Sequence, residues 1–240
     1  MPAQDPPHRV GLAANVQGWE DITFLHWSFP VTTVQALLPP GLRVHDLDGR
    51  AWVGVTPFRM RDVRLPRVPP LPHLSTFPEV NVRTYVRDRD GTAGIWFFSL
   101  DCPRLPVIGA LRVLGLPYMW AAMALQTDRE RGRVAYASSR RAGPGPRGAG
   151  VRALVEAGPR IADPDDLVVE LTARWWAFSR RAGRVWRVPA EHPPWPLHEA
   201  TARVDAGGLL VAAGLPLPGE PPMVHFSPGV ETRLGLPRPA

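Results

Sequence analysis

The sequence predicts a mostly β protein in which antiparallel strands form a curved sheet or barrel, with only a few short helices. Three observations predict this fold class. The 240 residues include 30 prolines, and proline removes a backbone donor and disrupts helix interiors. Runs rich in aromatic and β-branched residues recur, as in 22–29 and 79–87. The segments 79–87 and 94–100 are joined by Asp88-Arg-Asp-Gly91, a sequence typical of a hairpin turn.

The expected strands are short and are spread along the whole chain. They cover residues 22–29, 42–44, 51–61, 79–87, 94–100, 134–141, 151–156, 184–189, 199–204, 209–213 and 223–226. A turn at Asp48-Gly49 is expected to join 42–44 to 51–61. The proline-rich stretch 65–77 is expected to be a surface loop.

Helices are expected to be few. Three of them cover residues 31–38, 106–114 and 118–125. A fourth helix has Asp163 as its expected N-cap and Pro164 as its first helical residue. Leu167, Leu171 and Trp175 then recur at helical spacing and form one apolar face.

The chain is expected to form one domain over residues 19–232, between a proline-rich segment, 1–18, and a C-terminal tail, 233–240. Its beginning lacks the apolar core of a signal peptide, and its most apolar stretch, 105–125, is interrupted by prolines and an arginine. Cys102 is the only cysteine, which excludes an internal disulfide and favours a reducing compartment. A cytoplasmic protein without a membrane segment is therefore expected.

The chain is basic, with a formal net charge of +6 and a pI of about 10.7. All 28 basic residues are arginine, because the sequence contains no lysine. These arginines are scattered, and none lies in a nucleic-acid motif with interleaved aromatic residues. The pattern favours a solvated surface over a nucleic-acid footprint, so nucleic-acid binding ranks last among the functional hypotheses.

The most informative polar pattern lies in 79–85, where residues alternate with a period of two. Glu79, Asn81, Arg83 and Tyr85 share one face of the expected strand, and the valines between them face the other way. A surface strand with its valines in the core would show the same alternation. If the polar face instead points into a barrel, its groups must be paired or bound to a ligand. The neighbouring run Trp96-Phe-Phe98 is apolar throughout, which favours the second reading.

The roles that these side chains could take follow from their chemistry. Glu79 is a candidate for proton transfer, Asn81 for orienting a ligand, and Arg83 for holding an anion. Alternate residues on a strand lie about 6.6 Å apart, so only two or three of the four can contact one small ligand. A structural ion pair between Glu79 and Arg83 in the barrel wall is the alternative.

Other reactive residue types form no recognisable site. His192 and His198 are separated by a proline-rich stretch, without a Cys or carboxylate at metal-ligand spacing, so no metal site is expected. His192 with Trp195 is expected to form a packed corner at a pocket mouth, and His26 is expected to be structural. No phosphate-binding loop, dinucleotide fingerprint or nucleophile elbow is present, and no cofactor is expected.

Several ordered motifs carry a resemblance to a known family. They are Phe24-Leu-His-Trp27, Leu38-Pro-Pro-Gly-Leu42, residues 49–58, Glu79-Val-Asn-Val-Arg-Thr-Tyr-Val86, residues 94–101, Leu116-Pro-Tyr118, residues 192–197 and Phe226-Ser-Pro-Gly-Val230. From about Trp19 to Val230, the chain resembles the YqjF-like family of uncharacterised bacterial proteins. That family is similar to the acetoacetate decarboxylase-like superfamily. The resemblance implies a cone-shaped, mostly antiparallel β-barrel around a small-molecule cavity.

The resemblance also shows where the chemistry departs. The decarboxylase forms an imine through a lysine that follows a Gly-x-Pro turn, a few residues after an arginine. Here Arg112 precedes Gly115-Leu-Pro117, and Tyr118 follows where the lysine is expected. A phenol cannot form an imine, although it can polarise a carbonyl or exchange a proton. Glu79 resembles the position of an active-site glutamate in the superfamily, while Tyr118 as a packed residue at a helix start remains the alternative.

These readings lead to two main functional hypotheses. The first is a cofactor-independent lyase, hydratase or isomerase that acts on a small keto or hydroxy acid. Glu79 and Tyr118 would be catalytic, and the substrate-binding residues would be Asn81, Arg83, Arg112, Trp96 and His192. The second is a non-catalytic small-molecule binding or sensor module on the same scaffold. Either way a small-molecule ligand is the expected partner, and assembly into a homo-oligomer is left open.

Overall fold

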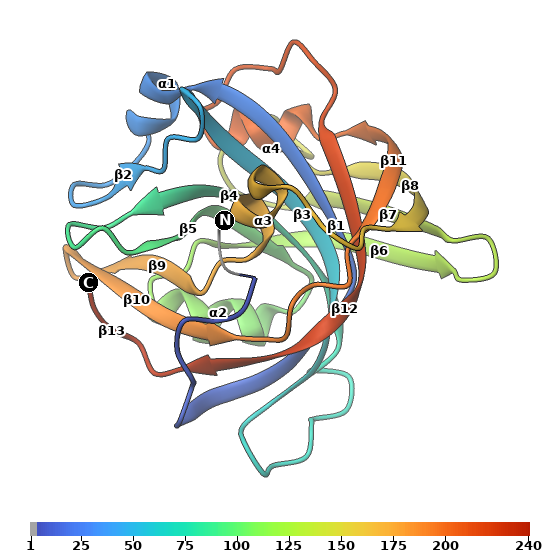
Figure 1. The fold of residues 1–240 in the computed structure, drawn as a ribbon. Coiled ribbons are helices and arrows are strands. Elements are labelled where there is room, and N and C mark those ends of the chain that lie inside the picture. Colours follow the sequence, from blue (N-terminus) through green and yellow to red (C-terminus); the bar gives the residue numbers. More distant parts are fainter. Residues whose placement is uncertain (1–3) are drawn as a thin grey trace.

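The computed structural model describes residues 4–240 and confirms a mostly β fold, with one continuous thirteen-stranded sheet (Figure 1). The strands are β1 (Ala13–Pro30), β2 (Arg43–Val44), β3 (Arg50–Arg64), β4 (Phe77–Arg87), β5 (Ala93–Cys102), β6 (Tyr118–Asp128), β7 (Arg133–Arg140), β8 (Arg152–Arg160), β9 (Trp176–Arg181), β10 (Arg184–Glu191), β11 (His198–Asp205), β12 (Met223–Gly235) and β13 (Arg238–Pro239). The loop between β3 and β4 extends away from the sheet, at the bottom of Figure 1.

Four short helices connect the strands among the described residues. They are α1 (Val31–Gln35), α2 (Leu105–Val113), α3 (Asp166–Thr172) and α4 (Gly207–Ala212). Within residues 4–240, no helix has both the length and the apolar character that a membrane crossing requires.

Two expected elements have the other secondary structure. Residues 118–125, expected as a helix, form most of strand β6, and 209–213, expected as a strand, lie mainly in helix α4. Both stretches are short apolar runs, whose periodicity does not separate helix from strand. Pairing with β7, from Ala121 opposite Arg140 to Asp128 opposite Arg133, decides the first case. Burial of the adjacent Leu209 and Leu210 in the core accompanies the helix in the second.

Two local expectations also need correction. Strand β2 pairs with β4 and not with β3, so the Asp48-Gly49 turn closes only an isolated bridge between Leu47 and Arg50. The N-cap of α3 is Asp165 and not Asp163, because Asp165 Oδ1 accepts a 2.8 Å hydrogen bond from the backbone N–H of Val168. Three aspartates lie close together here, and only the one that reaches this orphan N–H acts as the cap.

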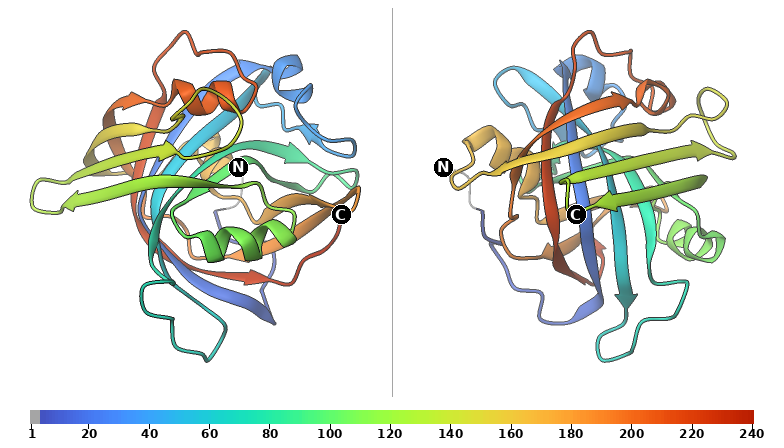
Figure 2. Two further views of the ribbon diagram at one scale, coloured as in Figure 1. Left: turned by 180° about the vertical axis from the view of Figure 1, so that it is seen from behind. Right: turned by 90° about the vertical axis from the view of Figure 1, so that its right-hand side faces the viewer.

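Nine strands close into a barrel in the order β5–β6–β7–β8–β11–β12–β1–β3–β4, and β4 pairs back onto β5. The barrel is mixed, because β5 and β6 run parallel. Val53, Val82 and Val155, with no exposed surface, belong to the large apolar core that fills it. Figure 2 shows the green and yellow strands β6, β7 and β8 side by side as one wall of this barrel.

A second ring shares part of the same sheet. β5 also pairs in parallel with β9, β9 pairs with β10, and β10 pairs with the far end of β12. The strands β12, β1, β3, β4 and β5 therefore separate two interiors. Side chains on both faces of β4 are buried as a result, and α3 lies across the face that is turned away from the nine-strand core (Figure 1).

The sheet extends past both boundaries of the domain expected at 19–232. β1 begins at Ala13, where it pairs with Gly235 at the end of β12. β13 then pairs with β10 through Arg238 and Pro239. Residues 13–16 of the expected N-terminal segment are therefore strand partners of residues 233–235 of the expected C-terminal tail.

The turn before β6 gives the first testable prediction. Gly115 has φ +79°, and a Cβ atom there would overlap the backbone carbonyl of Arg180 in β9. We expect Gly115→Ala to lower the free energy of unfolding by about 2–5 kcal/mol, through the left-handed backbone and the overlap together. Gly49→Ala is the matched control, because Gly49 has φ +75° and no atom within 4 Å of the added Cβ. Urea unfolding that gave equal losses for the two variants would contradict the packing argument.

Candidate functional site

The polar face of β4 is enclosed within the protein. Glu79 is 2% exposed, Asn81 5%, Arg83 8% and Tyr85 0%. The surface-strand reading of 79–85 is therefore wrong, because the valines and the polar side chains are both buried, in two different interiors. The polar side chains share their face with Phe24, Leu100 and other residues of the second core.

Glu79 and Tyr118 form a direct pair on this face. Tyr118 begins β6 and pairs with Leu100 of β5, which places its phenol beside β4. The Tyr118 hydroxyl donates a 2.9 Å hydrogen bond to Glu79 Oε2. Tyr118 thus starts a strand and not a helix. Its hydrogen-bond partner is Glu79, whose position resembles that of an active-site glutamate in the superfamily.

The Glu79 carboxyl has a strongly altered proton affinity. Burial raises the pKa of Glu79 from 4.5 to about 8, the hydrogen bond from Tyr118 opposes the rise, and the charge of Asp101 adds to it. Burial, together with the adjacent Glu79 charge, raises the pKa of Tyr118 well above 10. At neutral pH the pair is therefore mostly a neutral carboxylic acid beside a neutral phenol.

Asp101 acts from the opposite face of the sheet. It pairs with Val80, so its side chain lies with the core of the nine-strand barrel. There Arg140 Nε donates to both Asp101 oxygens, at 2.9 and 3.0 Å, and Arg140 also donates to Ser99. Both members of this buried ion pair lie on the nine-strand side of the sheet, so neither side chain occupies the Glu79 face.

Arg83 is a buried cation without an acidic partner. Among residues 4–240, no carboxylate forms an ion pair with it, and its Nε has no hydrogen-bond partner. Its guanidinium carbon lies 5.4 Å from the Phe24 ring centre and 5.9 Å from that of Tyr85. The Glu79–Arg83 ion pair considered as an alternative does not form. About 13 Å of strand separates the two Cα atoms, and Asn81 lies between them.

His26 is the functional candidate that sequence reasoning placed among structural residues. Its Nε2 lies 2.6 Å from the Tyr85 hydroxyl, which in turn donates a 2.7 Å hydrogen bond to the Leu171 carbonyl of α3. Gly54 makes room for this contact, since a Cβ there would come within 3.1 Å of the His26 ring. The only signal in the sequence is the alternation that puts His26 and Phe24 on one face of β1.

An aromatic layer covers the site. His192 is 3% exposed, and its ring packs against Trp19, Trp175 and Trp195 at centroid distances of 5.8, 4.6 and 4.8 Å. Trp195 also contacts Phe24 edge-on, and its Nε1 donates to the Thr172 carbonyl of α3. Burial lowers the pKa of His192 from 6.5 to about 4, so the ring is neutral at physiological pH. The expected packed corner therefore lies directly over this face.

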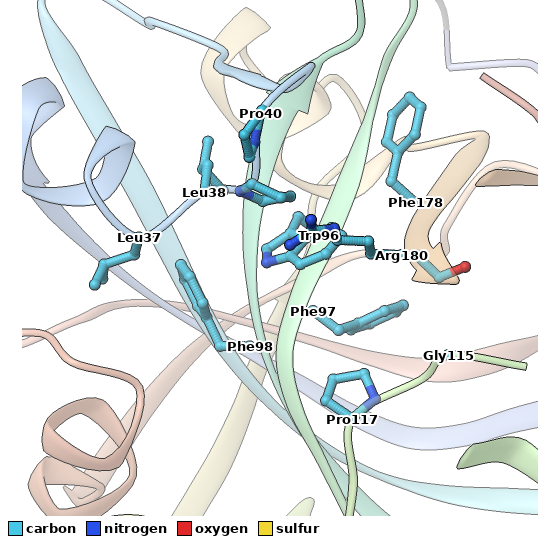
Figure 3. A pocket seen from close by; sticks show the side chains of 12 residues that line it. Leu37, Leu38, Pro40, Trp96, Phe97, Phe98, Gly115, Pro117, Phe178 and Arg180 are labelled. Atoms are coloured by element: carbon cyan, nitrogen blue, oxygen red, sulfur yellow. The ribbon is translucent and has the colours of Figure 1, made fainter. Parts of the chain in front are cut away.

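Two of the proposed binding residues lie elsewhere. Arg112 is exposed on α2, and its Nε donates a 2.8 Å hydrogen bond to the Tyr118 carbonyl, so it supports the turn before β6. Trp96 pairs with Thr84 and shares that residue's face, opposite to Arg83. It lines a separate groove of about 590 Å³, between Leu38 and Phe178 (Figure 3). The period-two reading covered only β4, so it could not show on which side of β5 Trp96 lies.

Comparison with known proteins places the chain in a family. The model of DUF2071, described as "Uncharacterized conserved protein", matches residues 16–231. The chain belongs to the DUF2071 family. It is also 32% identical over 214 residues to the uncharacterized protein YqjF of Bacillus subtilis (strain 168), which covers 88% of this chain and 86% of YqjF. The YqjF-like resemblance is therefore confirmed.

Solved structures similar to this DUF2071 protein confirm the fold. Acetoacetate decarboxylase of Legionella pneumophila matches with a TM-score of 0.66 and 14% identity, covering 100% of this chain and 92% of that one. The enduracididine biosynthesis enzyme MppR, complexed with pyruvate, also matches at 0.66 and 14%, covering 98% and 90%. An acetoacetate decarboxylase-like enzyme from Sphingomonas wittichii RW1 matches at 0.64 and 14%, covering 98% and 95%. At these identities the likeness shows the shared fold alone.

Proposed function

We propose that the polar face of β4 is the active site of a cofactor-independent lyase, hydratase or isomerase that acts on a small keto or hydroxy acid. One observation carries the proposal: Arg83 is a buried guanidinium that has no acidic partner among residues 4–240, on the same strand face as Glu79. A buried charge is costly unless it is compensated, and a ligand carboxylate would compensate it through charge-assisted hydrogen bonds.

The chemistry of the other residues fits this role. Glu79, with its pKa near 8, can give or take a proton close to neutral pH, which is where a general acid or base is most effective. Tyr118 holds the Glu79 carboxyl in place and can polarise a substrate oxygen. Asn81 lies between Glu79 and Arg83 on the strand, and His192 belongs to the aromatic layer over this face. Because the chain has no lysine, none of these steps passes through an imine.

The similar structures support a small acid as the ligand. One of them is an acetoacetate decarboxylase, and another, MppR, is complexed with pyruvate. Both names refer to small keto acids, whose carboxylate is the group that Arg83 is suited to bind. A non-catalytic binding or sensor module is the second candidate, because the unpaired Arg83 by itself requires only binding.

Binding of small acids tests the site. We expect pyruvate, acetoacetate, lactate or 3-hydroxybutyrate to raise the melting temperature of the wild-type protein, and Arg83→Met to abolish the increase, because the carboxylate loses its cation. Arg112→Met is the matched control, since Arg112 is exposed on α2 and its guanidinium bonds a backbone carbonyl in place of the polar face of β4. Stabilisation that survives in Arg83→Met but disappears in Arg112→Met would overturn the assignment.

Turnover separates the enzyme from the binding module. We expect that an acid which binds will exchange its carbon-bound protons with deuterated buffer or will form product. Proton NMR measures both. Glu79→Gln should slow this reaction by about 100-fold or more, because glutamine cannot transfer a proton. Binding without turnover in the wild-type protein would leave the sensor module in place of the enzyme.

A further inference from the structure

Four buried polar atoms, which find no partner in the part of the chain that the structure describes, lie at neighbouring positions on the polar face of β4. They are Arg83 Nε, His26 Nδ1, Asn81 Oδ1 and Thr56 Oγ1. Gly54 pairs with both His26 and Arg83, and Thr56 pairs with Asn81, so the four side chains occupy adjacent rows of β1, β3 and β4. Buried polar groups are ordinarily hydrogen-bonded, and an unpaired one carries a penalty. The cluster therefore has hydrogen-bonding capacity left for a polar molecule.

The hydrogen-bonding role of His26 is set by its neighbours. The Leu171 carbonyl can only accept, so the Tyr85 hydroxyl must donate to it. The Tyr85 oxygen is then the acceptor for His26 Nε2–H. Complete burial lowers the pKa of His26 well below 6.5, so the ring is neutral and carries only one N–H. Nδ1 is consequently a buried lone pair that requires a donor.

The four atoms together describe a complementary ligand. Arg83 offers donors to an anion, whereas His26 Nδ1 can only accept, and Thr56 can do either. Asn81 presents an acceptor as placed, but its amide can turn over, so the argument rests on His26. A keto oxygen has no proton to give to Nδ1. An ammonium group would be repelled by the adjacent Arg83, which leaves a hydroxyl as the suitable donor.

We propose that the ligand of this site carries a hydroxyl group as well as a carboxylate, so that a small hydroxy acid binds in preference to the keto acid of the same skeleton. Its carboxylate contacts Arg83, and its hydroxyl donates to His26 Nδ1. This inference rests on the proposed function, because it assumes that the face binds a carboxylate, and it narrows the substrate class. The hydroxy acid is then the substrate or the product of the reaction at Glu79.

Two matched pairs of ligands test the proposal. Lactate with pyruvate, and 3-hydroxybutyrate with acetoacetate, differ only in a hydroxyl against a carbonyl. Titration calorimetry on the full chain at pH 7 should show at least about 10-fold tighter binding of a hydroxy acid, because a site with an unpaired acceptor discriminates against a ligand without a donor. His26→Phe should reduce the ratio to near one, by weakening the hydroxy acid alone.

A second pair of variants keeps the test decisive if His26→Phe does not fold. Thr56→Val removes one of the four unpaired polar groups from the polar face of β4. It should reduce the ratio by which the hydroxy acid binds more tightly than the keto acid. Thr23→Val makes the same change on the opposite face, where Thr23 bonds to Tyr136, and should leave the preference unaltered. A keto acid bound as tightly as its hydroxy acid, or alanine bound more tightly than lactate, overturns this inference but not the carboxylate site. Absence of binding by every acid overturns both.

Discussion

Glu79→Gln should remove a loss of stability that the wild-type protein shows as pH rises from about 4.5 to above 8. Burial raises the pKa of Glu79 from 4.5 to about 8, so between these values the folded state holds a proton that the unfolded state has released. The favourable contribution is complete below pH 4.5 and is lost as the pH passes 8. Glutamine has nearly the same shape and does not titrate.

The expected difference is large. The two proteins should be similarly stable near pH 4.5, and the variant should be more stable by about 3–5 kcal/mol at pH 9. Urea unfolding across this pH range measures the difference. Neutral histidines such as His192 titrate in both proteins, so their effect cancels in the comparison. Parallel stability curves would show that Glu79 is ionised at neutral pH, which would remove its role as a general acid.

The second large effect comes from two buried arginines in different interiors, Arg140 of β7 inside the nine-strand barrel and Arg83 of β4 in the second ring. Arg140 is paired with Asp101, whose side chain is 1% exposed, so Arg140→Met leaves a buried carboxylate without its cation. We expect a loss of about 3–5 kcal/mol in the free energy of unfolding. Arg83 has no carboxylate partner among the described residues, so Arg83→Met should instead raise the stability by about 1–3 kcal/mol.

Chemical denaturation of both variants at pH 7 tests this contrast. Adding Asp101→Leu to Arg140→Met should recover most of the loss, because the uncompensated charge disappears. If Arg83→Met proved as destabilising as Arg140→Met, Arg83 would have a structural partner and the ligand assignment would fail. The expected result, a more stable protein that no longer binds acids, is the pattern of a residue retained for function.

The charge of Asp101 also affects the proton affinity of Glu79. Asp101 and Glu79 lie on opposite faces of the same sheet, and the Asp101 charge raises the pKa of Glu79. The ion pair with Arg140 opposes the effect of burial on Asp101 itself. The nine-strand barrel thus contributes electrostatically to a site that lies outside it.

Part of this site could be predicted from the amino-acid order. The period of two in 79–85 placed Glu79, Asn81 and Arg83 on one face, and the ordered motifs indicated the barrel family. The absence of lysine excluded imine chemistry without any coordinates. The shared face and the missing imine chemistry depend on local geometry and on composition, which a chain carries with it however it folds, whereas the barrel family followed from the resemblance of the motifs.

The remaining features depended on contacts between segments far apart in the chain. Strand β5 decided whether the polar face of β4 met solvent. It pairs with both β6 and β9, so the two rings of strands enclose both faces of β4. The same closure turned 118–125 into a strand and set Tyr118 against Glu79, 39 residues away. It also left Arg112 outside and brought His26 to the site. Alternation along one strand determines which side chains share a face, whereas only the rest of the sheet determines what that face meets.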